Sequence, residues 1–449
     1  MSLYPALFRN ILMPAYEIFR GKKLLKYIDE YQSHLSWNKE QISEWQWQKL
    51  QLLLKHAYEN TEFYPQHWQS VGINSYLDIK NLDDFAKLPP INKSDIRENY
   101  QKFVGSHHHD NIVKATGGST GQPFSFELDI QSNTRREAVM WRGYNWLNAG
   151  LGVKTLYLWG TDLGNPAHTK KLKNELYHSF YNRKMLNSFA MNRSNMSQYI
   201  EQINEYQANA IVSYVNPLYE LSRYILENNC TVTPPKSILT GAEQLHDFQR
   251  EVIERAFKAP VYNTFGCREF MLIAAECQKE KHLHINSDHL VVEIIDANNQ
   301  PITDKSGEMV ITDLFNYGMP FIRYINGDRA TMSQNQCSCG NPLPIIGSVD
   351  GRKLDIIKTT NGASIPGELF PHMLKEYKGV ERFQVIQKEL TSITIKLVTN
   401  SEFTKNNQQT IISDINKYSK GALEINIQQV SDIPLTKTGK HRVTICEVK

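Results

Sequence analysis

Hydrophobic positions in the first 60 residues recur at the spacing of a helix. Leu24, Ile28 and Tyr31 lie three to four residues apart, and Leu50 and Leu53 continue such a pattern further along. We therefore expect helices across residues 1–60. The opening segment is amphipathic, which favours a helix packed on its own domain over a helix that touches a membrane surface.

From about residue 110, short apolar runs alternate with longer amphipathic segments. The pattern predicts strands at 154–159, 210–214, 237–240 and 261–265, and helices at 195–206, 217–227 and 246–257. Strand, helix and strand in this order indicate a parallel sheet with crossover helices. Two further β-rich runs, at 290–295 and 308–312, predict a smaller β subdomain that follows the α/β part.

The last hundred residues change character. Strands are predicted at 383–386, 392–398 and 424–430, with a helix around 408–418. The glycines at 351 and 362 flank a charged, β-like segment, RKLDIIK. We therefore expect a domain boundary near residue 350, with a large α/β domain over residues 1–350 and a compact α+β domain over residues 351–449.

Composition limits the possible classes of protein. Of the 449 residues, 41% are hydrophobic and 22% are charged, which is typical of a globular protein and not of a disordered chain. The net charge is +3 and the basic residues are scattered, so no nucleic-acid partner is expected. No apolar stretch reaches the ~18 residues of a membrane span, and the opening segment is a poor signal peptide. Six cysteines are too few for a disulfide scaffold, which indicates a reducing, cytoplasmic compartment.

The segment KATGGSTGQP, Lys114–Pro123, has the composition of an anion-binding loop. Its glycines let the backbone approach a ligand closely, and its hydroxyl groups add donors, so the segment suits a triphosphate. It is not a Walker loop, because no Gly-Lys-Ser/Thr follows at the required spacing. Taken alone, a turn of this composition is more often an ordinary hairpin.

An apolar run precedes each of two further segments, TGAEQL and YNTFGCREF. Both would therefore lie at the carboxyl ends of adjacent parallel strands, where open α/β sheets bind ligands. Phe265 offers a flat face for a base, and Glu269 offers a carboxylate for a magnesium ion. Asp328, in NGDRA, is a candidate acceptor for sugar hydroxyls. Lys440 lies in the polar loop PLTKTGKHR, where the plain alternative is a solvated lysine.

Six motifs occur in the order seen in the adenylate-forming superfamily of acyl-CoA synthetases, adenylation domains and luciferases: TGGSTGQP, GAE, FGCRE, GDRA, GRKLDIIK and PLTKTGK. The chain most resembles phenylacetate–CoA ligase-like proteins, particularly the CapK-like branch of capsule biosynthesis. The segments HAYENTEFYPQHW, LPPINKSDIREN and AECQKEKHLHI support that branch. The resemblance spans roughly residues 20–449, and it implies a large adenylate-forming domain followed by a small mobile one.

The resemblance also implies roles for individual residues. The β- and γ-phosphates of ATP would be wrapped by Thr116, Gly117, Gly118, Ser119, Thr120 and Gly121. The adenine would be lined by Gly241, Ala242 and Glu243, with Phe265 and the adjoining Gly266 against its face. Glu269 would hold magnesium, Asp328 the ribose, and Arg352 the ribose or phosphate. Lys440 would bridge the substrate carboxylate and the α-phosphate, because two anions that approach need a cation to offset their repulsion.

The predicted hinge departs from the family pattern. Two residues after Arg352 the family usually has Asp or Lys, whereas this chain has Leu354 between Lys353 and Asp355. We therefore expect the C-terminal domain to pivot differently, which bears on the second half-reaction more than on the first.

Cysteines and histidines form a second constellation. Cys337 and Cys339, in CSCG, resemble a zinc knuckle, and Cys277 with one histidine would complete a tetrahedral set of three sulfurs and one nitrogen. We choose His284 over His282, because the LH dipeptide also occurs in the resembling branch. Four protein ligands leave no open position, so the predicted zinc is structural. The alternative is two unrelated turn cysteines beside surface histidines.

The sequence thus favours an ATP-dependent enzyme. It would convert a small carboxylic acid to an acyl-adenylate with release of pyrophosphate, and pass the acyl group on, most simply to coenzyme A. An alternative acceptor is an amine, such as an amino sugar or an amino acid, as the CapK-like resemblance to polysaccharide gene products permits. A non-catalytic nucleotide-binding scaffold is the alternative of another class, against which Glu269 and Lys440 argue. The acid, the acceptor and the oligomeric state, including a homodimer, stay open.

Overall fold

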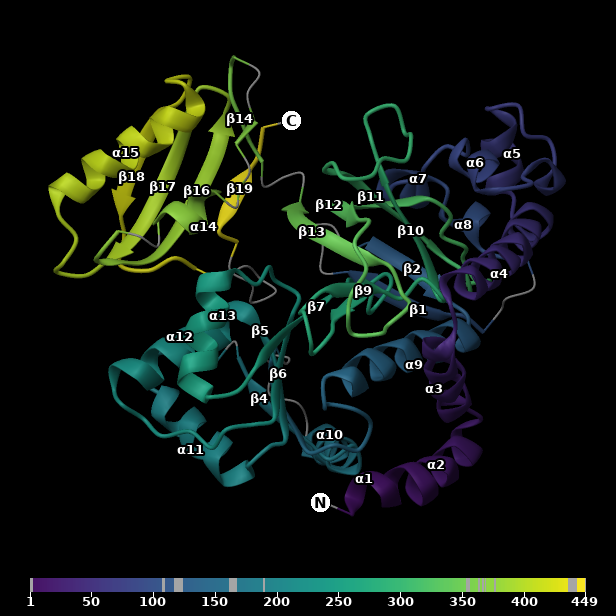
Figure 1. Cartoon of the computed structure of the whole chain (residues 1–449), viewed down its shortest axis with the longest axis horizontal. Helices are drawn as coiled ribbons and strands as arrows, with labels where there is room; N and C mark the ends of the chain where they lie inside the picture. The colour runs from purple at the N-terminus through teal and green to yellow at the C-terminus, as the bar shows by residue number, and fades with distance from the viewer. Residues whose placement is uncertain are drawn as a thin grey trace. The chain divides into compact units, whose positions relative to one another are not determined.

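The structure is a computed structural model that describes residues 3–106, 110–116, 124–160, 168–188, 190–352, 356–361, 364–365, 367, 369–374, 377–434 and 442–448. The chain divides into two compact units (Figure 1). The first unit consists of residues 1–326 and 331–348, and the second consists of residues 327–330 and 349–449. No helix in the described ranges combines the length and the apolar character that a bilayer span requires.

Helices occupy the N-terminal hundred residues of the first unit, and the helices expected across residues 1–60 are confirmed. They are α1 (Tyr4–Leu7), the π-helical η1 (Phe8–Leu12), α2 (Met13–Arg20), α3 (Leu24–Ser33), the 3₁₀ turn η2 (His34–Ser36), α4 (Lys39–Asn60), α5 (Phe63–Gln69), the 3₁₀ turn η3 (Tyr76–Asp78), α6 (Leu82–Ala86), α7 (Lys93–Glu98) and α8 (Tyr100–Phe103). Helix α4 begins with a capping box in which Asn38 and Gln41 satisfy each other's backbone N–H groups. Its buried stripe includes Leu50, Leu53 and Ala57, as the spacing predicts.

A hairpin and a long helix follow. Strands β1 (Ile112–Thr116) and β2 (Phe124–Leu128) are antiparallel, with Thr116 paired to Phe124. The glycine-rich residues 117–123 connect these two strands and lie outside the described residues. Helix α9 (Ile130–Trp146) begins at Asp129, whose side chain accepts a hydrogen bond from the Ser132 N–H group.

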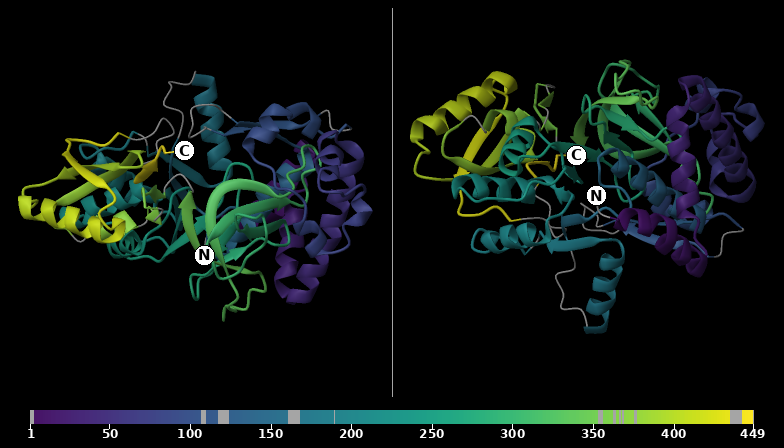
Figure 2. Two further views of the ribbon diagram at one scale, coloured as in Figure 1. Left: turned by 90° about the horizontal axis from the view of Figure 1, so that it is seen from above. Right: turned by 60° about the horizontal axis from the view of Figure 1, so that its bottom comes forward.

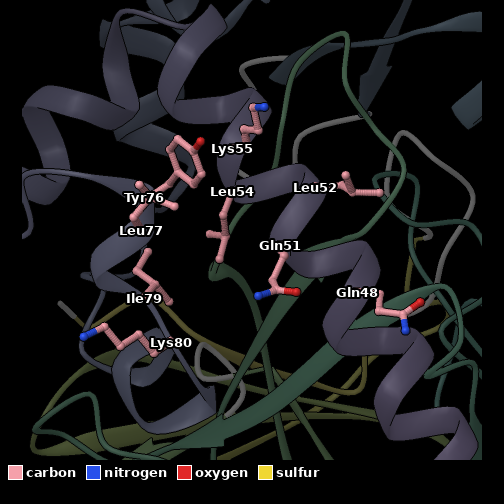
Figure 3. Close-up of a pocket in the computed structure, with 9 residues that line it drawn as sticks. All are labelled: Gln48, Gln51, Leu52, Leu54, Lys55, Tyr76, Leu77, Ile79 and Lys80. Atoms are coloured by element: carbon pink, nitrogen blue, oxygen red, sulfur yellow. The ribbon is translucent and has the colours of Figure 1, made fainter.

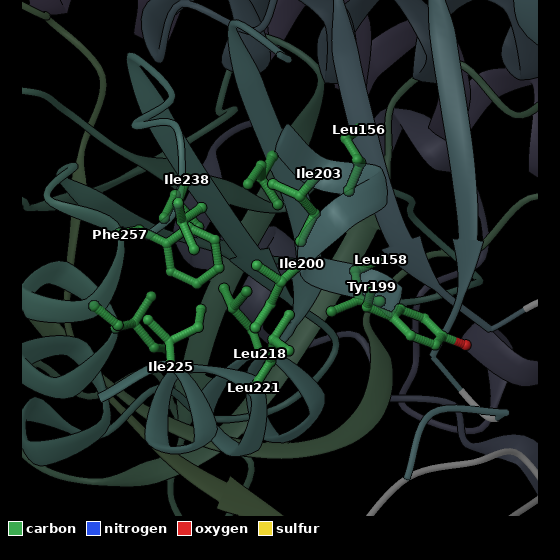
Figure 4. Close-up of a cluster of buried hydrophobic side chains, with 14 of the residues drawn as sticks. Leu156, Leu158, Tyr199, Ile200, Ile203, Leu218, Leu221, Ile225, Ile238 and Phe257 are labelled. Carbon is green, nitrogen blue, oxygen red and sulfur yellow. The ribbon is translucent and has the colours of Figure 1, made fainter. Parts of the chain in front are cut away.

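The centre of the first unit is a parallel sheet with crossover helices, as predicted. Its strands are β3 (Thr155–Trp159), β4 (Arg183–Asn187), β5 (Ala210–Tyr214), β6 (Ser237–Gly241) and β7 (Val261–Phe265), in the order β4-β3-β5-β6-β7. The crossover helices are α10 (His168–Phe180), α11 (Met196–Tyr206), α12 (Val215–Glu227) and α13 (Asp247–Phe257). Every residue of β5 and β6 is buried, which is typical of parallel strands covered on both faces. Leu158, Ile200, Leu218 and Phe257 pack in the core between sheet and helices (Figure 4).

The β-rich run after β7 continues the same sheet. Its strands are β8 (Ala274–Glu276), β9 (Leu283–Ile285), β10 (Leu290–Ile295), β11 (Gly307–Asp313), β12 (Tyr324–Ser333) and β13 (Ile345–Arg352). The antiparallel pairing of Thr264 with Ala275 joins β8 to β7, and the whole sheet has 11 strands. The expected β subdomain is therefore present as an antiparallel extension. The tight turn after β7 needs Gly266, because a Cβ atom there would lie 1.8 Å from the Met271 carbonyl oxygen.

A buried polar network ties the N-terminal helices to this sheet. The Arg142 guanidinium of α9 donates to Asp288 at 2.8 Å and to Asn286 at 2.6 Å, and His34 lies 2.9 Å from Asp288. Although burial opposes its ionisation, Arg142 and His34 hold the pKa of Asp288 well below its usual range. Turn η2 and helix α9 are therefore fixed against the segment that precedes β10.

The second unit has the α+β character predicted for the end of the chain. It contains β14 (Ile357–Lys358), β15 (Ser364–Ile365), α14 (Leu369–Leu374), β16 (Val380–Glu389), β17 (Ser392–Thr399), α15 (Lys405–Ser419), β18 (Glu424–Gln429) and β19 (Thr444–Cys446). The order of its four-stranded sheet is β18-β17-β16-β19, with β16 and β17 antiparallel and the outer pairs parallel. Ile395 and Leu397 of β17 pack with Ile411 and Ile415 of α15 in the core.

Candidate functional site

The carboxyl ends of the parallel strands gather the candidate nucleotide-binding residues at one edge of the sheet. Tyr214 at the end of β5 pairs with Gly241 at the end of β6, and Phe265 ends the neighbouring strand β7. Trp159, at the end of β3, stacks on Tyr214 with ring centroids 4.0 Å apart. Burial raises the pKa of Tyr214 to about 12, the Glu243 carboxylate adds to the rise, and Arg268 opposes it. No local pattern in the sequence indicates this aromatic pair.

The GAE segment is held in a strained turn. A Cβ atom at Gly241 would lie 2.7 Å from the Thr264 hydroxyl oxygen, so this strand end has no room for a larger residue. Ala242 has a φ of 64°, in the left-handed region that favours glycine, at a cost of about 1 kcal/mol. The turn directs Glu243 towards the start of α12, where its carboxylate accepts a hydrogen bond from the Asn216 N–H group at 2.8 Å.

The Glu269 carboxylate lies beside an ammonium group. Its side chain is 5% exposed, and its Oε1 atom lies 3.2 Å from Lys93 Nζ and accepts a hydrogen bond from the Tyr324 hydroxyl at 3.2 Å. Lys93 comes from α7, far away in the sequence, and its ammonium group also lies 5.6 Å from the Phe124 ring centroid. The structure therefore adds Lys93 and Tyr324 to the candidate residues around Glu269.

Helix α9 holds the backbone of the FGCRE turn through Arg136. The Arg136 guanidinium, which is buried, donates to the backbone oxygens of Arg268, at 3.0 Å, and Glu269. Burial lowers the pKa of Lys114, which is on β1, and the positive charges of Arg268 and Arg136 lower it further. Positive charge is therefore concentrated where β1 enters the glycine-rich segment, which favours an anionic ligand there.

The remaining predicted nucleotide-binding residues lie elsewhere in the chain or outside the described residues. Asp328, on β12, and Arg352, the last residue of β13, belong to the second unit. Gly117, Gly118, Ser119, Thr120 and Gly121, the hinge residue Leu354, and Lys440 lie outside the described residues. Thr116 is the last residue of β1. The structure thus brings together Gly241, Ala242, Glu243, Phe265, Gly266 and Glu269 at the strand edge.

Four potential metal ligands converge at the antiparallel side of the sheet. The ligand atoms of Cys277, His284, Cys337 and Cys339 all lie within 4.8 Å of one another. The Sγ atoms of Cys277 and Cys337 are 3.5 Å apart, and Cys339 Sγ lies 3.4 Å from His284 Nε2. Two ligands at the Zn–S distance from one tetrahedral ion lie roughly 3.7 Å apart, so these separations suit zinc.

The orientation of His284 suits a metal ligand. Its Nδ1–H group donates to the Leu343 carbonyl oxygen at 2.9 Å, which leaves Nε2 unprotonated and directed at Cys339. Burial lowers the pKa of His284 and thereby favours this neutral form. His282, by contrast, has a side chain that is 40% exposed and lies 3.2 Å from Glu280. The structure therefore groups His284 with the three cysteines, and places His282 with Glu280 and Cys337.

A pocket of about 510 Å³ lies apart from both groups (Figure 3). Its lining residues come from α4 and from the segment around η3: Gln48, Gln51, Leu52, Leu54, Lys55, Tyr76, Leu77, Ile79 and Lys80. None of them belongs to the strand edge or to the cysteine cluster, and none is a carboxylate, a thiol or an imidazole. We therefore do not regard this pocket as the candidate active site.

Comparison with known proteins gives a consistent set of relatives. Residues 357–447 match the family model described as the CapK C-terminal domain. The chain is 25% identical to the protein CapK of Staphylococcus aureus, over 99% of this chain and 98% of that protein. It is 24% identical to a phenylacetate-coenzyme A ligase of Pseudomonas putida, over 85% of this chain and 88% of that protein.

Solved structures share the fold. A 2-hydroxyisobutyryl-CoA ligase in the postadenylation state superimposes with a TM-score of 0.71 at 16% identity, over 89% of this chain and 88% of that chain. The amide bond synthetase McbA of Marinactinospora thermotolerans superimposes with a TM-score of 0.52 at 14% identity, over 73% of this chain and 66% of that chain.

Proposed function

Since the chain is a member of the adenylate-forming superfamily, similar to CapK and to phenylacetate–CoA ligases, we propose that it activates a carboxylic acid with ATP and then transfers the acyl group. A carboxylate oxygen attacks the α-phosphorus, the bond to pyrophosphate breaks, and an acyl-adenylate forms. A nucleophile then attacks the acyl carbonyl carbon, and AMP leaves. The observation that carries this proposal is the juxtaposition, on adjacent strand ends, of the GAE turn and the FGCRE turn that holds Glu269.

We assign the nucleotide to this strand edge. Gly241, Ala242 and Glu243 would line the adenine, with Phe265 and Gly266 against its face, and the segment from Thr116 to Gly121 would bind the phosphates. The positive charge of Lys114, Arg136 and Arg268 supports the phosphate assignment, because these groups gather where that segment begins. Asp328 and Arg352 would contact the ribose or phosphate, and Lys440 would neutralise the approach of carboxylate and α-phosphate.

Glu269 is the residue we propose to hold magnesium. The fit rests on the chemistry of its surroundings: a buried carboxylate that already meets a cation, Lys93, can also meet a divalent ion. Bound Mg²⁺ would neutralise phosphate charge during the displacement. The hydrogen bond from Tyr324 would hold the carboxylate in place, and Arg136 would keep the backbone of the turn fixed.

Coenzyme A is the acceptor we propose first. The similarity to phenylacetate–CoA ligases over 85% of the chain supports it. An amine acceptor is the second candidate, because the fold is shared with an amide bond synthetase and because CapK matches nearly the whole chain. With an amine, the product would be an amide, and a place in capsular polysaccharide assembly would follow.

We also propose that Cys277, His284, Cys337 and Cys339 hold a structural zinc ion. Four ligand atoms within 4.8 Å of one another and a histidine oriented by a backbone carbonyl support it. The zinc would tie the loop around residue 337 to β9. All six cysteines are unpaired, which supports a reducing compartment such as the cytoplasm.

Exchange of labelled pyrophosphate into ATP tests the main proposal. The protein is incubated with Mg²⁺ and a panel of aryl and short-chain acids, one at a time. Exchange that depends on one acid supports the proposal and names the substrate. Nucleotide binding without exchange for any acid would instead favour the scaffold alternative. Coenzyme A, amino sugars or amino acids are then added to the protein with ATP and the acid that supports exchange. The product distinguishes thioester from amide formation.

A further inference from the structure

The first helical segment has one face packed on the protein and one apolar face open to solvent. Helix α1, η1 and α2 follow one another without a break from Tyr4 to Arg20, and Phe8 and Met13 on the inner face are fully buried. The exposed side chains of the outer face are large and apolar: Leu3 (85% exposed), Leu7 (44%), Ile11 (60%), Ile18 (85%) and Phe19 (84%). Side chains of this kind gathered on one face mark an interaction surface. We call these five residues the outer stripe.

The outer stripe follows from the spacing of its residues. Leu3, Leu7 and Ile11 are four residues apart, and Ile18 comes seven residues later, close to two helical turns. The opposite face is fixed in place. The Phe8 ring lies 4.9 Å from the Phe180 ring of α10, and the Tyr4 hydroxyl donates to the Phe180 carbonyl oxygen at 2.8 Å. The helical segment, drawn in purple in Figure 1, therefore cannot turn its outer stripe inward without losing these contacts.

Positive charge accompanies the stripe. Residues 4–26 contain five basic residues and one acidic residue, a net charge of +4, whereas the whole chain has a net charge of +3. Arg9 pairs with Asp29, and Lys22 lies 3.4 Å from Glu137. The exposed basic residues are Arg20, Lys23 and Lys26, and within the described ranges these three form no ion pair.

We propose that this surface binds the face of an anionic phospholipid bilayer. The helical segment would lie in the plane of the membrane, with the outer stripe at the boundary between headgroups and acyl chains. Arg20, Lys23 and Lys26 would then lie among the lipid phosphates. An apolar helix face with exposed lysine and arginine residues close by in the sequence is the pattern of helices that lie on membranes, at a depth of roughly 5–10 Å. Because the segment would lie in the plane of the membrane, the association would be peripheral.

A second copy of the chain fits this surface less well. A two-fold contact through the outer stripe would bring the exposed cations Arg20, Lys23 and Lys26 of two copies towards each other, at an energetic cost. The proposal is independent of the catalytic assignment, because lipid binding needs neither ATP nor an acid. A negative result for lipid binding therefore does not affect the catalytic proposal, and a negative result for catalysis does not affect the lipid-binding proposal.

Vesicle sedimentation of the full chain tests the proposal. The parent protein is mixed with vesicles of phosphatidylcholine alone or of phosphatidylcholine with phosphatidylglycerol. We expect binding to the anionic vesicles, weak binding to the neutral ones, and a loss of binding as salt is added. Two variants, Ile18→Asn with Phe19→Asn and Lys23→Glu with Lys26→Glu, should each lower the partition coefficient roughly tenfold or more.

Control variants show whether a change in vesicle binding is specific to the outer stripe. The variant Leu77→Asn with Lys80→Glu changes an exposed leucine and a lysine beside the pocket in Figure 3, and it should bind as the parent does. The variant Ile18→Asn with Phe19→Asn should unfold at the temperature of the parent, since these side chains are 85% and 84% exposed. Equal binding of parent and stripe variants, or no binding to anionic vesicles, overturns the proposal. So does a dimer that the asparagine variant abolishes while the parent ignores the vesicles.

Discussion

Lys93 Nζ lies 3.2 Å from Glu269 Oε1, which brings a cation from α7 against the buried carboxylate that follows β7. The two residues are distant in the sequence, and Tyr324 donates to the same oxygen atom. When no nucleotide is bound, Lys93 thus partly neutralises the negative charge of Glu269, the carboxylate that we propose as the magnesium ligand. Substitution at this pair therefore tests the proposed chemistry.

We expect Glu269→Gln to slow adenylate formation by ~10²-fold or more, because an amide cannot neutralise a divalent ion as a carboxylate does. Pyrophosphate exchange measured against Mg²⁺ concentration checks this. Tyr324→Phe is the matched control, since it removes one hydrogen bond to Glu269 and leaves its charge, and it should cost much less. Exchange at the parent rate in the glutamine variant would remove Glu269 from the mechanism.

For the cysteine cluster, we expect about one equivalent of zinc in protein purified without added metal. Cys339→Ser should lower the zinc content and the temperature of unfolding, because a structural metal contributes directly to folding. Elemental analysis and thermal unfolding provide the two readings. Cys230→Ser, which changes a cysteine outside the cluster, should affect neither. Zinc-free parent protein whose cluster thiols all react while it is folded would contradict the assignment.

Asp313 should give a stability difference that depends on pH. It is buried, and burial raises its pKa from 3.8 to about 6, which the positive charge of Arg136 only partly opposes. The folded state therefore binds this proton more tightly than the unfolded state. The stabilisation from Asp313 is complete below about pH 4 and is lost as the pH rises through about 6.

The variant Asp313→Asn does not titrate, so its stability relative to the parent should increase between pH 4 and 7, by up to about 3 kcal/mol. Denaturant unfolding at several pH values measures the difference. A flat difference curve for Asp313→Asn would mean that the folded protein does not raise this pKa.

We expect Lys440→Ala to lose the first half-reaction and keep the second. The ammonium group offsets repulsion between carboxylate and α-phosphate, and the family resemblance implies that it leaves the active site after adenylation. The variant should fail with ATP and acid, yet convert a chemically prepared acyl-adenylate when the acceptor is supplied. Lys437→Ala, three residues earlier, should keep both. If Lys440→Ala handles the prepared adenylate as poorly as it handles ATP, the two-orientation model is wrong for this chain.

The parts of the fold that the sequence predicted are those with a strong local pattern. Strand β7 was predicted at its observed bounds, and β5 likewise, because short runs rich in β-branched, aliphatic and aromatic residues stand between amphipathic segments there. Strand β4 was missed, since only Leu186 of its five residues is buried and an edge strand need not be apolar. The antiparallel extension was expected as a separate subdomain, because the pairing of Thr264 with Ala275 leaves no trace in periodicity.

The candidate sites divide in the same way. The cysteine cluster was foreseeable, because metal chemistry restricts the residue types to a few, and their spacing is visible in one chain. The role of Lys93 could not be predicted from the sequence, because nothing in its local sequence distinguishes it from a surface lysine. It approaches Glu269 because the β-bridge between Ile91 and Tyr324 brings the two segments together. A contact between distant segments has no local pattern in a single sequence.

The short strand β8, which follows the FGCRE turn, links the proposed nucleotide edge to the cysteine cluster. Strand β8 has only three residues, with β7 and the proposed nucleotide edge on one side, and it leads directly into Cys277. Glu276, the last residue of β8, links β8 to β7, because its carboxylate accepts a hydrogen bond from the Asn263 N–H group of β7 at 2.8 Å. Loss of the proposed zinc ion, or oxidation of its cysteine ligands, would therefore disturb the proposed nucleotide edge through β8.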